Sequence, residues 1–570
     1  MSRQVMTRGS ARALGLAATL ALALSAPGTA QASEAPVAGA VMISSQAAYR
    51  FQGWGTSLAW WANVVGGWNS AGEVEDALFG VPDRAHPDRL GLSVIRYDIG
   101  ATPVLWCAPD QTSGCSATPS RDRVLPVADP SLVPGCRSFG PGRAVPVLAA
   151  GPGQNPDLGR DRNQVAVLRA ALSRAPRDTF ALEAFANSPP WWLTVSGCPQ
   201  GNRDATDPRD NLAPESYDAY AGYLVDVLRA FRQRGIAFDS LAPLNEPENP
   251  WGQDNNPYTG QPFCTANCQE GMHFGPEPPL RQAPAIAPLL DAVCRRLDAD
   301  GIATRVSTPD GFNPTDTGAL VAQTVPLPGC VTQVNTHMYD FVFPNGVVPY
   351  GQGISIYDPT GASGGRQALG QAAQALSRGL WMSEFGTGGA PGDVSTALAY
   401  SSVIAADMRF LRPTAWVNWQ AVEGSGGWGL FEAPSFPREG ALIRTKRFSA
   451  LEQYARFIRP GFQILTTLDP LDDTVHERTG TMAAVDDLRH PRRLVIVGTN
   501  TAAADRHVVY DLGALGLTGD GRATVTRFRT TGQDDVRSLG STSISTAAVE
   551  DDQPAGSITT YVVDLHQAGS

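Results

Sequence analysis

The stretch Asp239-Ser-Leu-Ala-Pro-Leu-Asn-Glu-Pro247 joins a short apolar run to a carboxylate, and Gly379-Leu-Trp-Met-Ser-Glu-Phe-Gly386 repeats this arrangement later in the chain. Both apolar runs are typical of a buried strand. A carboxylate at the C-terminal end of a β/α-barrel strand points into the catalytic mouth, whereas one at the opposite end usually serves stability. We therefore expect Glu246 and Glu384 to lie in the mouth of a barrel.

Two carboxylates in one cleft are the groups that cleavage of a glycoside requires. One protonates the leaving oxygen, and the other attacks the sugar or activates water. Taken alone, either glutamate could be a neighbour of a helix N-cap or a surface charge. Because both occur in the same kind of context, the pair favours a carbohydrate-cleaving enzyme.

The remaining chain contains enough strand-like segments to close such a barrel. These segments alternate with helix-like ones, which indicates an α/β fold with a parallel sheet. We expect a (β/α)8 TIM barrel with eight strands. They are Phe51–Thr56, Ser93–Ile99, Phe180–Ala186, Asp239–Leu244, Ala303–Ser307, Val331–Thr336, Gly379–Met382 and Thr414–Trp419. Helices are expected at Asn163–Ser173, Ser216–Arg234, Ile286–Asp298, Gly365–Ser377 and Val394–Arg409.

The first 32 residues resemble a secretory signal peptide. Arg3, Arg8 and Arg12 form a basic region, Ala13 to Leu24 is apolar, and Ala30-Gln-Ala32 is a small-residue cleavage site. The apolar run is shorter than the ~20 residues that span a bilayer. The sequence therefore predicts a secreted, extracellular protein without a membrane anchor.

Three further segments follow the expected signal peptide. Residues 33–48 are strand-like, and we expect them to pack with the C-terminal domain. The catalytic barrel is expected over residues 49–458. Residues 459–570 contain short β-rich segments separated by Gly, Asp and Thr turns, which predicts an antiparallel β-sandwich. We expect the protein to be a monomer.

Charge and composition exclude several classes of function. The chain has a formal net charge of −11 and no basic cluster, which argues against nucleic-acid binding. Lys446 is the single lysine, so Schiff-base chemistry is disfavoured. The seven histidines are scattered, with no pair at metal-ligand spacing. Neither a metal nor another cofactor is expected.

The eight cysteines form an even set in a chain predicted to be exported. They predict up to four structural disulfides, whose connectivity the sequence leaves open. Cys264 and Cys268 have the spacing of half a metal site, but no matching pair of His or Cys accompanies them.

Two long loops follow predicted barrel strands on the mouth side, Ala101–Arg160 after the second strand and Glu246–Pro284 after the fourth. Loops of this length in a compact domain are usually functional or disordered. We expect the first to form one wall of a cleft.

Several blocks of the chain, taken together and in this order, resemble glycoside hydrolase family 30, and within it the endo-β-1,6-galactanases most nearly. The resemblance covers about residues 44–470 and fades through the C-terminal domain. The blocks are Phe51-Gln-Gly-Trp-Gly-Thr-Ser-Leu-Ala-Trp-Trp61, Ala186-Asn-Ser-Pro-Pro-Trp-Trp192, Leu244-Asn-Glu-Pro247, Gln269-Glu-Gly271, Thr336-His-Met-Tyr339, Trp381-Met-Ser-Glu-Phe-Gly386, Trp419-Gln-Ala-Val-Glu423 and Lys446 through Gly461.

The resemblance implies a retaining, two-step mechanism. By position, Glu246 corresponds to the general acid/base and Glu384 to the nucleophile. Asn245 corresponds to a residue that hydrogen-bonds the sugar 2-hydroxyl, a contact that strengthens in the oxocarbenium-like transition state. Arg96 matches an arginine that keeps the nucleophile ionised, and Tyr339 matches a group that orients it.

Further residues are candidates for substrate contact, although each could be structural. Sugars stack on exposed aromatic rings, and several tryptophans and polar residues lie near predicted strand ends. The candidates are Trp54, Trp191, Trp419, His337, Asn187 and Glu423, with Glu270 less well placed.

Asp98 departs from the family pattern, which has asparagine at this position. Strand alternation puts Asp98 on the same side as Arg96, so the two side chains could pair. That pairing would weaken the support that Arg96 provides to Glu384. An additional charge would also raise neighbouring pKa values, which leaves the pH optimum open.

Three functions remain to be distinguished. The first is a retaining endo-glycosidase that cleaves β-1,6-galactan, such as arabinogalactan side chains. The second is the same mechanism on another β-linked glycan, namely β-1,6-glucan, glucuronoxylan or a β-galactoside cleaved from its end. The third is a non-catalytic carbohydrate-binding protein, whose usual mark is the loss of one glutamate.

Overall fold

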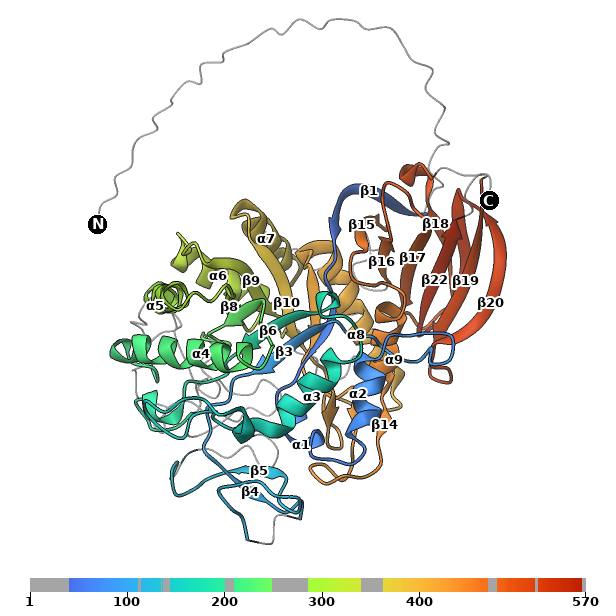
Figure 1. Cartoon of the computed structure of the whole chain (residues 1–570). Coiled ribbons are helices and arrows are strands. Elements are labelled where there is room, and N and C mark those ends of the chain that lie inside the picture. Colours follow the sequence, from blue (N-terminus) through green and yellow to red (C-terminus); the bar gives the residue numbers. More distant parts are fainter. Residues whose placement is uncertain are drawn as a thin grey trace, which may run out of the picture. The chain divides into compact units, whose positions relative to one another are not determined.

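The computed structural model describes residues 40–110, 114–134, 136, 144–199, 210–248, 286–339, 362–469, 479–517 and 521–565. Within these residues, eight strands close into a parallel barrel (Figure 1). Around the barrel their order is β2 (Gly53–Ser57), β3 (Val94–Asp98), β6 (Ala181–Phe185), β7 (Ser240–Ala242), β8 (Arg305–Gly311), β9 (Val331–His337), β10 (Gly379–Phe385) and β11 (Ala415–Asn418).

The barrel and all eight of its predicted strands are confirmed. The main differences are at the C-terminal ends of two strands. β8 continues to Gly311, four residues beyond the predicted end, and β10 continues to Phe385. These extensions include Asp310 and Glu384 in the strands that line the mouth.

Helices connect the barrel strands and cover them. Amphipathic α4 buries Tyr220, Leu224, Val227, Leu228 and Phe231, as its sequence pattern predicts. α6 was not predicted; it begins after the N-cap Asn313, whose side chain accepts a bond from the Asp316 amide. The helices are α1 (Ala62–Val65), α2 (Ala71–Phe79), α3 (Arg162–Leu172), α4 (Tyr217–Arg232), α5 (Ile286–Ala299), α6 (Pro314–Thr324), α7 (Ala362–Ala375), α8 (Val394–Ala406) and α9 (Lys446–Ala455).

The Ala101–Arg160 loop contains some regular structure. Its strands β4 (Val104–Cys107) and β5 (Leu125–Ala128) form an antiparallel pair. A second small sheet, of β12 (Val422–Glu423), β13 (Phe431–Glu432) and β14 (Ile443–Arg444), follows the last barrel strand.

The C-terminal strands form a mixed sheet. In the described part of the chain, nine strands are hydrogen-bonded in the order β20-β19-β22-β17-β16-β15-β1-β18-β21. β1 pairs with β15 in antiparallel and with β18 in parallel, so the sheet is not purely antiparallel as predicted. The strands are β1 (Val41–Arg50), β15 (Gln463–Leu468), β16 (Thr479–Val485), β17 (Arg493–Asn500), β18 (Arg506–Asp511), β19 (Arg522–Thr530), β20 (Arg537–Ser545), β21 (Ala548–Gln553) and β22 (Ser557–Leu565).

Buried polar bonds fasten this sheet to the barrel helices. Gln453 of α9 donates from Nε2 to Thr530 Oγ1 at 2.8 Å and accepts from Thr560 Oγ1 at 2.6 Å. Ser401 of α8 bonds Thr499 at 2.6 Å. Because these groups are buried, losing either partner would leave the other unsatisfied.

Three disulfides are present among the described cysteines: Cys107–Cys115, Cys136–Cys198 and Cys294–Cys330. Cys264 and Cys268, the two cysteines left for a fourth disulfide, lie outside the described residues, as do Glu270 and the expected signal peptide. No helix in the described ranges is long and apolar enough to cross a membrane.

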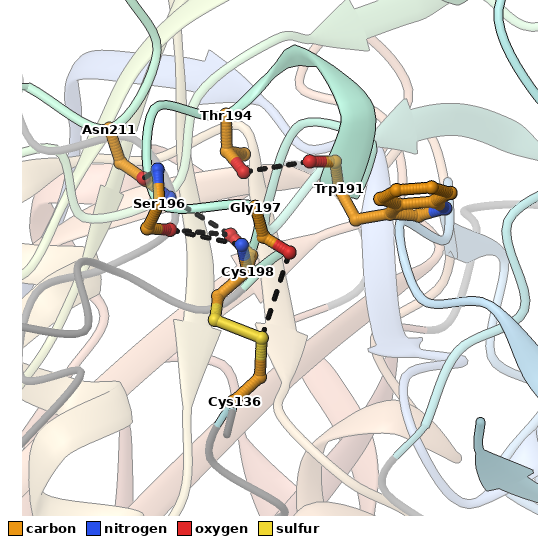
Figure 2. The surroundings of a disulfide bond; sticks show 7 residues. All are labelled: Cys136, Trp191, Thr194, Ser196, Gly197, Cys198 and Asn211. Atoms are coloured by element: carbon orange, nitrogen blue, oxygen red, sulfur yellow. Dashed lines mark hydrogen bonds between the residues drawn. A yellow bond between two sulfur atoms is a disulfide. The ribbon is translucent and has the colours of Figure 1, made fainter. Parts of the chain in front are cut away.

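The Cys136–Cys198 bond ties the first long loop to the turn that carries Trp191 (Figure 2). Asn211 Nδ2 donates to Cys198 O at 3.0 Å, and Thr194 Oγ1 donates to Trp191 O at 2.9 Å. The disulfide therefore braces one end of a turn whose other end is beside the barrel mouth.

Replacing both Cys136 and Cys198 with serine should lower the free energy of unfolding by about 4 kcal/mol, because a long loop loses its crosslink. The matched control is Cys107→Ser with Cys115→Ser, which opens a loop of only 8 residues and should cost about 2.5 kcal/mol. Guanidinium unfolding of both variants measures the difference. A larger loss of unfolding free energy in the Cys107→Ser, Cys115→Ser variant would contradict the dependence on loop length.

Candidate active site

Glu246 and Glu384 meet in the mouth of the barrel. Glu246 follows β7 and Glu384 lies in β10; they are 3% and 4% exposed. One oxygen from each and a ring nitrogen of His337 lie within 4.8 Å of one another. The two glutamates, remote in sequence, therefore face a single small space.

His337 bridges the two carboxylates from β9. Its Nδ1 lies 2.8 Å from Glu246 Oε1 and 3.6 Å from Glu384 Oε1, and its Nε2 lies 3.3 Å from Asp310 Oδ1. Although burial lowers it, the Glu384 and Asp310 carboxylates raise the pKa of His337 well above its ordinary value. The ring is completely buried, so it acts on the two glutamates rather than offering an open face to a substrate.

The two oxygens of Glu384 differ in their surroundings. Tyr339 donates its hydroxyl to Oε1 at 3.0 Å. Oε2 lies 3.5 Å from Arg96 Nη1 and accepts no hydrogen bond from the described residues. Burial raises the pKa of Glu384 to about 7, with Glu246 acting in the same direction, whereas His337 and Arg96 oppose the rise. One oxygen is thus held while the other is left available.

Arg96 is the centre of a buried ion network beneath the glutamates. Its Nε lies 2.9 Å from Glu183 Oε1, its Nη2 contacts Asp310, and its Nη1 donates to Ser383 O at 3.1 Å. Against the effect of burial, Arg96 and His337 hold the pKa of Asp310 well below its usual range. Arg96 therefore compensates several carboxylates at once.

Asp310 and Glu183 belong to the site and were not predicted. Asp310 stands at the C-terminal end of β8, as Glu246 follows that of β7, but the predicted strand ended at Ser307, three residues before Asp310. A predicted strand that continued to Gly311 would have included Asp310. Glu183 lies within β6, opposite Arg96 in strand register, and no local signal distinguishes it.

Glu246 and Asp310 also share an uncommon backbone conformation. Their φ values are +42° and +60°, in the left-handed region that few non-glycine residues adopt. The Glu246 amide donates to Asp310 O at 2.9 Å, so the two strained residues are bonded to each other. Such strain is commonly stored at functional sites.

Asp98 does not pair with Arg96. The described ion pairs of Arg96 involve Glu183, Asp310 and Glu384, while Asp98 Oδ2 accepts from Asn187 Nδ2 at 3.4 Å. Burial, and next the charge of Asp161, raise the pKa of Asp98 well above its ordinary value. Asp98 is therefore shifted toward its protonated form, and Arg96 keeps its contact with Glu384.

Four of the predicted substrate contacts lie on the mouth side of the barrel. Asn245, Asn187, Trp191 and Trp419 lie at strand ends on the mouth side, and Asn245 Oδ1 and Asn187 Oδ1 have no hydrogen-bond partner among the described residues. Trp419 packs edge-on against Trp60, with ring centroids 5.1 Å apart. These residues remain available to bind a sugar.

Trp54 was wrongly assigned to substrate contact. It is 1% exposed, and its ring packs against Phe51, Trp416 and Tyr454 in the main core. Its Nε1 donates to Ile458 O at 2.9 Å. Strand alternation directs this side chain outward, toward α9, instead of into the mouth.

The cluster of Glu246, His337 and Glu384 has the spacing of a possible metal site, but its protonation does not suit one. A metal needs a ring nitrogen with a free lone pair. Both nitrogens of His337 face carboxylates, and its raised pKa favours the doubly protonated ring. The cluster is better suited to holding and moving protons.

Comparisons with known proteins agree with this geometry. The profile described as O-Glycosyl hydrolase family 30 matches residues 148–270. An endo-β-1,6-galactanase of Hypocrea rufa is 27% identical over 523 residues, covering 90% of this chain and 92% of that protein. The chain is thus similar to glycoside hydrolase family 30 in its sequence. It is therefore an O-glycosyl hydrolase, as the sequence motifs indicate.

Two further similarities of this enzyme are informative. An exo-β-1,6-galactobiohydrolase of Bifidobacterium longum is 29% identical over 238 residues, which cover 35% of this chain and 15% of that protein. The catalytic domain of a GH30 xylanase C from Talaromyces cellulolyticus has the same fold, with a TM-score of 0.59, 16% identity, and coverage of 92% of this chain and 99% of that one.

Proposed function

We propose that the enzyme is a secreted, retaining endo-glycosidase that cleaves β-1,6-galactan by double displacement. The observation that supports this most strongly is the short separation of Glu246 and Glu384, with oxygens within 4.8 Å. Retaining glycosidases place their carboxyl groups about 5 Å apart, whereas inverting enzymes need about 6.5–9.5 Å to admit a water. The similarity to the Hypocrea rufa galactanase over 90% of the chain supports the choice of substrate.

In this proposal Glu384 is the nucleophile. Tyr339 orients Oε1, which directs the unbonded Oε2 toward the anomeric carbon. Arg96, 3.5 Å from Oε2, favours the ionised form. Asn245 Oδ1 is free to accept the sugar 2-hydroxyl proton, a bond that strengthens in the transition state.

Glu246 is the proposed general acid/base. Its bond to His337 Nδ1 at 2.8 Å places a proton between the two groups. Transfer of that proton to Glu246 prepares it to protonate the leaving oxygen. After the glycosyl–enzyme forms, Glu246 takes a proton from the attacking water.

The substrate is tested by incubating the enzyme with arabinose-free β-1,6-galactan, β-1,6-glucan, glucuronoxylan and an aryl β-galactoside, and resolving the products over time. The expected result is early release of mixed β-1,6-galactooligosaccharides. Galactose alone, or a single disaccharide as the name of the Bifidobacterium longum relative implies for that protein, would contradict endo action. Binding of galactan with no product after long incubation would favour the carbohydrate-binding alternative.

Export and the oligomeric state are also proposals. We propose that residues 1–32 are removed on export, an interpretation that the three described disulfides support because disulfides persist in oxidising compartments. We also propose that the mature enzyme acts as a monomer.

Tyr339→Phe should shift the pH profile. The Tyr339 hydroxyl favours ionised Glu384, so its loss raises the Glu384 pKa above about 7. Since Glu384 attacks as the anion, the acidic limb of kcat/KM should move up by about one pH unit. A hydrogen bond to a charged group contributes about 1.5 kcal/mol or more, and one pH unit corresponds to about 1.4 kcal/mol.

Asp98→Asn is the control for this shift. Because burial and Asp161 raise the pKa of Asp98 well above its ordinary value, the amide should change little charge near Glu384, and the acidic limb should stay in place. A limb that moves to lower pH in Asp98→Asn would mean that Asp98 is ionised in the resting enzyme.

A further inference from the structure

Trp428 is the most exposed aromatic side chain in the described part of the chain, with 39% of its surface open. It lies in the connection between β12 and β13, after the last barrel strand. Large apolar side chains that remain open at a functional cleft often mark a ligand contact.

The ring of Trp428 lies beside Tyr339, one residue removed from the Glu384 carboxylate. Its centroid is 5.7 Å from that of Tyr339, the residue that bonds Glu384. It also packs against the chain just after β10. A Cβ added at Gly386 would lie 3.2 Å from Trp428 Cε3, and one added at Gly388 would lie 2.9 Å from Trp428 Cδ1. Two glycines therefore make room for this ring at the rim of the site.

The segment that carries Trp428 is held firmly. Arg447, only 1% exposed, donates to the carbonyl oxygens of Gly427 and Gly429 and to that of Gly389 beyond β10. The Glu423 carboxylate accepts the Trp428 amide at 2.5 Å. Glu423, predicted to bind substrate, thus has a direct structural task in positioning Trp428.

A rigid, open aromatic ring suits one class of occupant. Binding to a preformed surface loses little conformational entropy. A β-galactopyranosyl ring has an apolar face, because its axial 4-hydroxyl leaves the C3, C4 and C5 hydrogens together on one side. A β-1,6 linkage joins sugars through an exocyclic carbon, so this face stays uncovered along the chain.

We propose that Trp428 is the stacking platform of a sugar subsite adjoining the catalytic carboxylates, and that a galactosyl unit next to the cleaved bond packs its apolar face on the indole. The subsite rests on the proposed galactanase function. Its role is to hold the chain in register with Glu384 and Glu246, and it takes no part in bond cleavage.

The test measures binding separately from catalysis. In a Glu384→Gln background, calorimetry with β-1,6-galactotetraose should give a Kd about tenfold higher for Trp428→Ala, equal to about 1.4 kcal/mol. Trp428→Phe keeps an aromatic face and should stay within about threefold of the parent. Ile443→Ala is the matched control, since Ile443 is 40% exposed in neighbouring β14 and should leave Kd unchanged.

Further measurements separate the possible failures. With Glu384 intact, Trp428→Ala should raise KM for galactan about tenfold with kcat within about twofold. Unchanged Kd and KM in Trp428→Ala would overturn the proposal that Trp428 is a stacking platform. If the wild-type enzyme cleaves a different glycan, the proposed substrate is wrong, and the same variants are measured with that glycan. A selective loss in Trp428→Ala would then still support the platform, and no loss would reject it.

Discussion

Glu384→Ala should lower kcat by roughly 10⁴-fold or more, because it removes the proposed nucleophile of the covalent step. Glu246→Ala should lower kcat by roughly 10²–10⁴-fold on natural galactan, whose leaving group needs protonation. Both variants should fold, since neither glutamate belongs to the apolar core. Initial rates on galactan and thermal unfolding measure the two effects.

Azide separates the two roles. In Glu384→Ala, azide occupies the vacated side and attacks an activated β-galactoside directly, which yields the α-glycosyl azide. In Glu246→Ala, the glycosyl–enzyme still forms, and azide then attacks it from the opposite face, which yields the β-azide. Nuclear magnetic resonance of the products assigns the anomers.

Glu215→Ala provides the control, because Glu215 is exposed near the start of α4 and should keep full activity. The reverse pairing of variants and anomers would exchange the two assigned roles. Full activity in either glutamate variant would reject the double-displacement mechanism for this enzyme.

Arg96→Met should lower the free energy of unfolding by about 3–5 kcal/mol, the range for breaking a buried ion pair by removing one partner. Arg96 is completely buried and contacts Glu183, Asp310 and Glu384. Without the guanidinium these carboxylates are left in a site that excludes water. Methionine keeps a similar chain length, so the lost charge dominates. Urea unfolding at constant pH measures the change.

Arg295→Met is the surface counterpart. Its partner Asp218 lies at 3.1 Å, but the two side chains are 66% and 84% exposed, so the loss should stay below about 1 kcal/mol. Equal losses in the two variants would show that Arg96 does not compensate the buried carboxylates. A drop in kcat for Arg96→Met alone would additionally support its contact with Glu384.

Local pattern was enough to predict the barrel. A parallel strand buried on both faces is a short apolar run wherever it occurs, so segments such as Ser93–Ile99 and Val331–Thr336 could be recognised without knowing their neighbours. Several C-terminal strands, such as β17 and β22, could be recognised as short β-rich runs between turns. Their partners could not, because β1 bonds β15 and β18 from more than 400 residues away in the sequence.

The site was predicted only where chemistry coincides with a strand end. Glu246 and Glu384 stand at such ends, and the same rule would have included Asp310 had β8 been read to Gly311. Trp54 shows the limit of composition, because a tryptophan in a conspicuous motif can face the core as readily as the mouth. Trp428 lies in no conspicuous motif, and its proposed role depends on Gly386 and Gly388, which make room for its ring.

By itself, the sequence determined the two catalytic candidates, the eight barrel strands and the family motifs, since each is written in a short run of neighbouring residues. Tertiary structure alone decided that Arg96 contacts Glu183, Asp310 and Glu384, that Asp98 bonds Asn187 instead of Arg96, and that His337 joins the two glutamates. Charge compensation and burial depend on distances through space, and barrel closure creates those distances between residues that are far apart in the chain.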